Sequence, residues 1–80
     1  MEMSIEERKA TVRRIVAEVA GVDAGEVEAG MDLVGDLGID SPKALQLLVS
    51  LEEALEVEIS DEEAARMDSV GDIDSYVASL

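Results

Sequence analysis

Apolar residues recur at helical spacing in three stretches of this 80-residue chain, and each stretch follows a helix-start signal. The first signal is the S-x-x-E capping box of Ser4 and Glu7, in which each side chain satisfies a free backbone N–H. Gly21 accepts the left-handed conformation that ends many helices. The pattern predicts a helix that begins at Ser4 and stops before Gly21. Its apolar face consists of Ile5, Val12, Ile15, Val16 and Val19.

A second helix is predicted to start at Ser41, because serine is a favoured N-cap and Pro42 suits the first helical position. The run 43–56 contains no helix breaker. One face of this helix is apolar and should meet the core. It consists of Ala44, Leu47, Leu48, Leu51, Ala54 and Leu55.

Leu45 and Val49 fall outside this core face, about 100° round the helix. They flank Glu52 and Glu56. The sequence therefore predicts a small exposed apolar patch that is edged by carboxylates.

Residues 21–40 have no sustained helical period and contain five glycines, so we predict a long loop with a short helical turn after Asp23. Loops of this length inside a compact domain tend to be functional. Several apolar residues are spaced to pin the loop onto the core. They are Val22, Val27, Met31, Leu33, Leu37 and Ile39.

Two further helices are predicted near the C-terminus. Ser60 and Glu63 repeat the S-x-x-E box before a short helical turn over 61–66. The last helix starts after Ser69, with Asp72 placed where a negative charge suits the helix dipole. Its apolar stripe consists of Val70, Ile73, Tyr76, Val77 and Leu80. The fold class is therefore all-α: a four-helix bundle of three main helices and one short helix, with a long loop between the first two.

Composition limits the chemistry of this chain. The length fits one domain, residues 1–80. Cysteine and histidine are absent, so we predict no disulfide, no zinc-thiolate site and no conventional catalytic base. We assign no metal-ligating residues and expect only weak binding of divalent ions by clustered carboxylates. Tyr76 is the only aromatic residue, which leaves a core of aliphatic side chains and Met.

The formal net charge is −14, and all of it lies beyond the first helix. Residues 1–20 carry four acids and four bases, so residues 21–80 hold sixteen of the 20 acids and two of the six bases. Such a field repels nucleic acid and anionic membranes and attracts basic partners. Without a signal sequence or an apolar stretch long enough to span a bilayer, we expect a soluble, cytoplasmic, monomeric protein with no membrane insertion.

The segment 36–41, Asp-Leu-Gly-Ile-Asp-Ser, is the candidate chemical site. From the residues alone, Ser41 is a helix cap whose hydroxyl is exposed at a loop–helix junction. That position suits presentation to another enzyme. It does not suit nucleophilic catalysis within the chain, because no base stands beside the hydroxyl.

This segment resembles the D-x-G-x-D-S motif of acyl carrier proteins. The resemblance extends over the helix signatures at 5–8, 49–53, 58–64 and 69–76. It implies a bundle of acyl-carrier type, with 4'-phosphopantetheine attached to Ser41 and with Asp36, Gly38 and Asp40 as the motif around it. The arm's thiol would hold acyl intermediates as thioesters, in fatty-acid or related specialised lipid or polyketide biosynthesis.

The resemblance also implies partners. A phosphopantetheinyl transferase with its magnesium ion would modify the chain, and acyltransferases, ketosynthases or other acyl-handling enzymes would then use it. Basic patches on these enzymes would meet acidic positions at Asp40, Glu52 and Glu53. Leu45 and Val49 match the apolar contact positions, and Pro42 lies beside the arm. The chain would be a carrier and not an enzyme.

Three positions depart from the family pattern. Pro42 stands where an aliphatic residue is usual, while Lys43 and Gln46 stand where acids are common. These departures suggest a specialised carrier. Whether the aliphatic core shelters the acyl chain is left open by the sequence.

Other classes of protein fit the sequence less well than a carrier does. An unmodified acidic module that docks basic proteins would use Ser41 only as a cap. A peptidyl carrier is disfavoured by Asp40 and by the charge, and an EF-hand calcium sensor by the absence of its loop pattern. Asp32, Asp36 and Asp40 are too widely spaced for that loop.

Overall fold

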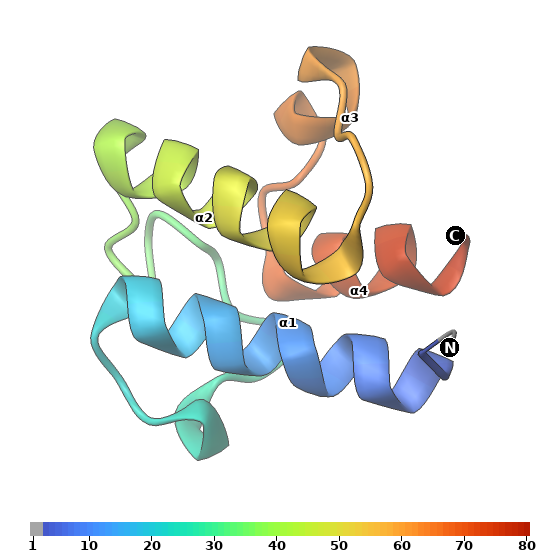
Figure 1. The fold of residues 1–80 in the computed structure, drawn as a ribbon. Helices are drawn as coiled ribbons and strands as arrows, with labels where there is room; N and C mark the ends of the chain where they lie inside the picture. Colours follow the sequence, from blue (N-terminus) through green and yellow to red (C-terminus); the bar gives the residue numbers. More distant parts are fainter. Residues whose placement is uncertain (1–2) are drawn as a thin grey trace.

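The computed structural model describes residues 3–80 and is all-α over that range (Figure 1). Three main helices and one short helix are present, together with a 3₁₀ turn, as the sequence predicts. They are α1 (Ile5–Ala20), η1 (Ala24–Glu26), α2 (Ser41–Leu55), α3 (Asp61–Ala65) and α4 (Val70–Ala78). Residues 3–80 contain no helix that is both long enough and apolar enough to cross a membrane.

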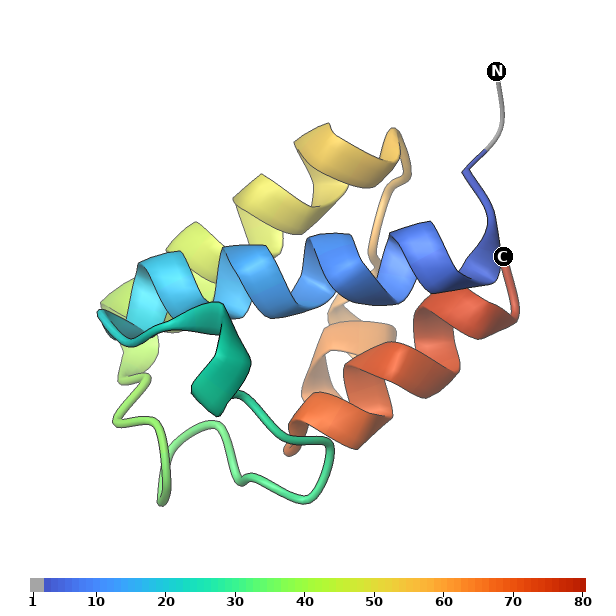
Figure 2. The ribbon, with the colours of Figure 1, turned by 90° about the horizontal axis from the view of Figure 1, so that it is seen from below.

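Helix α1 is the centre of the bundle, because both α2 and α4 pack against it. Its buried face carries Val12, Ile15, Val16 and Val19, which confirms most of the predicted stripe. Ile5 is the exception and is 45% exposed. It lies in the first turn of α1, at the end of the bundle where both chain termini emerge (Figures 1 and 2).

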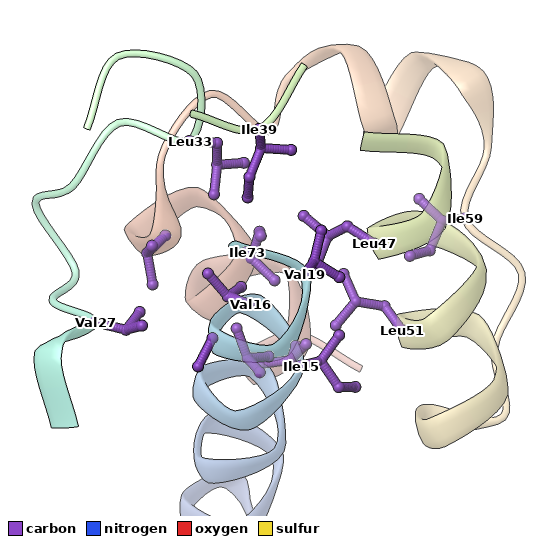
Figure 3. Close-up of a cluster of buried hydrophobic side chains, with 14 residues drawn as sticks. Ile15, Val16, Val19, Val27, Leu33, Ile39, Leu47, Leu51, Ile59 and Ile73 are labelled. Carbon is purple, nitrogen blue, oxygen red and sulfur yellow. The ribbon is translucent and has the colours of Figure 1, made fainter. Parts of the chain in front are cut away.

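The core is aliphatic throughout (Figure 3). Leu47 and Leu51 reach it from α2, and Ile73 reaches it from α4. Leu33 and Ile39 fill the side left open by the helices, and both come from the long loop. The loop is therefore part of the core. Val22, by contrast, is exposed just beyond the end of α1.

Backbone pairing also fastens this loop to the start of α4. Asp32 and Ser69 form an isolated antiparallel bridge. Around it, the Leu33 N–H donates to the Asp68 carbonyl at 3.0 Å, and the Val70 N–H donates to the Met31 carbonyl at 3.0 Å. These bonds fix the position, beside the start of α4, from which the loop turns back toward α2.

The helix ends confirm two of the predicted starts in full. Ser4 and Glu7 form both bonds of the capping box. Ser69 and Asp72 form a second complete box, in which Asp72 accepts the backbone N–H groups of Asp68 and Ser69 at 2.9 and 3.0 Å. The bond from Asp68, and next the bond from Ser69, lower the pKa of Asp72, because both favour its charged form.

The predicted box at Ser60 and Glu63 is only half formed. The Ser60 hydroxyl accepts the Glu63 N–H at 3.1 Å, but the return bond is missing. The Glu63 carboxylate instead faces Tyr76 of α4. Partial burial, followed by the negative charge of Glu63, raises the pKa of the Tyr76 phenol.

Arg13 joins α1 to α4 through two bonds to the Asp74 carboxylate, each 2.9 Å long. The side chains are 25% and 13% exposed, so water screens this pair less than it would a fully exposed one. Arg8 reaches the Val77 and Leu80 carbonyls at 3.3 and 3.4 Å. Together these bonds hold the C-terminal helix along α1.

Helix α2 ends one residue earlier than the unbroken run 43–56 suggests. Glu56 has φ 55°, a left-handed conformation, and the Val57 N–H donates to the Glu52 carbonyl at 3.2 Å. Gly21 ends α1 in the same way, with φ 76°. A non-glycine residue in this conformation is strained by contact between its Cβ and the backbone.

We therefore expect Glu56→Gly to raise the free energy of unfolding by about 1 kcal/mol. Glu56→Ala removes the same charge but keeps the Cβ, so it should not give this gain. Urea unfolding of both variants beside the parent measures the difference. Equal stabilisation by alanine and glycine would show that charge, and not backbone strain, is the cause.

Candidate functional site

The residues before Ser41 form a compact turn at 32–38. The Asp32 N–H donates to the Asp36 carboxylate at 2.7 Å, and the Gly35 N–H donates to the Asp32 carboxylate at 2.7 Å. Gly38 has φ 64°, which favours glycine, and its N–H donates to the Val34 carbonyl at 3.0 Å. Asp36 and Gly38 thus shape the backbone that leads into α2.

Asp40 is the N-cap of α2. Its backbone is extended, its carboxylate accepts the Lys43 N–H at 3.2 Å, and its carbonyl accepts the Ala44 N–H at 2.7 Å. The prediction that Ser41 caps the helix is therefore wrong by one residue. Ser41 is the first residue of α2 and Pro42 is the second. The Asp40 carboxylate accepts the Lys43 N–H, which is one of the free N–H groups in the first turn of α2, and so it takes the capping role.

The Ser41 hydroxyl is consequently exposed and makes no hydrogen bond to any residue in 3–80. This differs from the serines that precede the other helices, whose hydroxyls are occupied as caps. These are Ser4, Ser60 and Ser69.

An apolar cleft of about 300 Å³ opens one helical turn from Ser41. Ala44 and Leu45 lie three and four residues after Ser41 and therefore next to it on the helix surface. The lining also includes Val34 of the loop, Ala64 of α3 and Met67, which follows α3. The sequence pattern does not predict a site role for these three residues. Val34 is 68% exposed. The sequence feature that could have indicated its place at the cleft is an aliphatic residue within a turn of polar residues.

The outer surface of α2 carries the predicted apolar patch. Leu45 is 63% exposed and Val49 is 44% exposed, as their helical positions indicate. Pro42 and Glu53 are exposed nearby. Glu52 differs, because it is half-buried and its carboxylate accepts the Ile59 N–H at 2.9 Å.

Comparison with known proteins identifies the family of this chain. The Phosphopantetheine attachment site family matches residues 10–77. An acyl carrier protein of Clostridium acetobutylicum is 39% identical over 66 residues, which are 82% of this chain and 86% of the relative. The chain belongs to the acyl carrier protein family.

Solved acyl carrier protein structures share the fold. A Mycobacterium tuberculosis structure described as an acyl carrier protein superposes with a TM-score of 0.83 at 32% identity, over 90% of this chain and 96% of that one. The acyl carrier protein from Enterococcus faecalis gives 0.80 at 30% identity, over 96% and 98%. These matches favour a carrier over an unmodified acidic module.

Acyl carrier proteins hold acyl groups on 4'-phosphopantetheine, which supplies the thiol that this cysteine-free chain lacks. The chain's own residues fit that group. A free hydroxyl stands at the positive end of a 15-residue helix, where the negative charge of a phosphodiester is favourable. The cleft beside it is apolar, as a fatty chain requires.

The capping geometry predicts that substitutions at two neighbouring residues, Asp40 and Ser41, differ in their effect on stability. Asp40→Ala should lower the free energy of unfolding by about 1 kcal/mol, because it removes the cap of α2. Asp40→Asn should retain most of that stability, because its side-chain oxygen can also accept the bond. Ser41→Ala should change stability by less than about 0.5 kcal/mol. Urea unfolding curves measure all three, and a loss at Ser41 as large as that at Asp40 would contradict the assignment of the cap.

Proposed function

We propose that Ser41 is the residue that carries 4'-phosphopantetheine. The observation that supports this most directly is the exposed Ser41 hydroxyl, which is left without a bond because Asp40 caps the helix. Asp36 and Gly38 support it indirectly by shaping the turn that presents the junction.

Attachment requires a second protein. The Ser41 oxygen would form a bond to the phosphorus that bears the pantetheine group in coenzyme A, while the bond from this phosphorus to the rest of coenzyme A breaks. The Asp40 carboxylate already accepts the Lys43 N–H, and the chain contains no histidine. We therefore assign the base that takes the hydroxyl proton, together with the magnesium ion, to a phosphopantetheinyl transferase.

We propose that partner enzymes dock on the exposed side of α2. Pro42, Leu45 and Val49 offer an apolar strip that starts next to Ser41. Asp40, Glu52 and Glu53 add negative charge along it. Transferases, acyltransferases and ketosynthases with basic patches fit this surface, since opposite charge speeds and orients encounter.

The cleft favours a further proposal, that the chain shelters its acyl cargo. The lining is almost wholly aliphatic, and the volume lies at the low end of the range for small-molecule pockets. The remaining expectations stay predictions: one carrier domain over residues 1–80, working as a cytoplasmic monomer in fatty-acid or related biosynthesis.

Modification is tested by intact mass after incubation with coenzyme A, magnesium and a broad-specificity phosphopantetheinyl transferase. We expect the parent to gain one phosphopantetheine and Ser41→Ala to gain none. Ser50→Ala removes another serine of α2 and should be modified like the parent. A gain of mass by Ser41→Ala would contradict the proposed attachment point.

Sheltering is tested by the thermal midpoint of the phosphopantetheine form with an octanoyl group or an acetyl group on its thiol. Burial of the longer chain should stabilise the fold by at least about 1 kcal/mol, which is about 4 °C for a protein of this size. Ala64→Leu narrows the cleft and should reduce the gain. Equal thermal midpoints for the octanoyl and acetyl forms would show that the octanoyl group stays outside the cleft.

A further inference from the structure

The α3 side of the cleft is its least securely packed wall. Helix α3 has five residues, none of which is fully buried, and it lies on the far side of the bundle from α1 (Figure 1). Ala64 and Met67 nevertheless line the cleft. The position of this wall must therefore depend on how the chain is held on either side of α3.

The segment before α3 is held by Ile59. Its side chain is buried against the core beside α2 (Figure 3), and its N–H donates to the Glu52 carboxylate at 2.9 Å. This bond spans seven residues and joins the last turn of α2 to the segment that precedes α3. A backbone N–H that donates to a carboxylate forms one of the stronger classes of hydrogen bond.

Glu52 also faces the surface that we propose for docking. It follows Val49 by three residues, so the two side chains are neighbours on the helix. The residue is partly exposed, so a partner that docks on α2 can approach this side chain. The Glu52 carboxylate thus belongs to the proposed docking surface and also holds the segment that precedes α3.

We propose that Glu52 is a positioning residue that fastens the α3 wall of the cleft, and that a partner's guanidinium group unfastens this wall by pairing with the carboxylate. Arginine binds carboxylates through two parallel bonds, which use both oxygens. Such a pair draws the carboxylate toward the partner and competes with the Ile59 N–H for the Oε2 atom. This proposal rests on the proposed function, because the cleft matters only if the carrier holds a chain there.

The fastening is tested on the unmodified 80-residue protein by amide hydrogen exchange measured with NMR. Glu52→Ala should speed exchange of the Ile59 amide about tenfold or more, and should also speed exchange within α3. Glu52→Gln keeps an oxygen that can accept the bond, so the exchange rate of its Ile59 amide should be closer to that of the parent. Glu53→Ala is the matched control from the same turn of α2. Amides of the core helices, such as those of Val16 and Val77, should be unchanged in every variant.

The release is tested by adding hexa-arginine to the parent and to Glu52→Gln. In the parent, saturating peptide should speed exchange of the Ile59 amide severalfold. In Glu52→Gln the peptide still meets the other acids, but the Ile59 amide should stay protected, because the side chain at 52 no longer carries charge.

Two outcomes would overturn the proposal. One is Ile59 exchange in Glu52→Ala equal to that in Glu53→Ala, and the other is an equal effect of hexa-arginine on the parent and on Glu52→Gln. Neither measurement uses the phosphopantetheine arm. Failure of the proposal is therefore distinguishable from failure of Ser41 to be modified, which the mass measurement reports.

Discussion

The carboxylate of Asp40 accepts the Lys43 N–H, and this bond decides what Ser41 can do. Serine hydroxyls cap the other three α-helices of the bundle, so a serine at the start of α2 would ordinarily be occupied in the same way. Because Asp40 takes that role, the hydroxyl of Ser41 stays free at the positive end of the helix. The cleft and the apolar strip of α2 both begin within one turn of it.

The long loop gives Asp40 its position. Leu33 and Ile39 anchor the loop in the core, and the bridge between Asp32 and Ser69 ties it to α4. The turn that ends at Gly38 then directs the chain into α2. A segment without regular structure is thus anchored both by buried side chains and by backbone hydrogen bonds. The spacing of Asp36, Gly38, Asp40 and Ser41 has a physical meaning: the first three residues shape and cap the backbone, and the hydroxyl of the fourth is left free.

Local features of this fold could be predicted from the sequence. Three such features depend only on neighbours within a turn or two: the capping box of Ser4 and Glu7, the stop at Gly21, and the exposure of Leu45 and Val49. The cap of α2 was misplaced because Asp40 and Ser41 are both good N-caps, and backbone torsion angles decide between them. The Asp32–Ser69 bridge and the Glu52 bond to Ile59 could not be predicted, because each depends on where the chain folds back.

The central claim is that the capping arrangement leaves Ser41 as the serine available for modification. Tandem mass spectrometry of peptides from the transferase-treated parent protein tests it most directly, because it locates the added group on one residue. The account predicts the whole phosphopantetheine mass on Ser41, with Ser4, Ser60 and Ser69 unmodified. Recovery of the group on any of these capping serines, or on any residue other than Ser41, would contradict it.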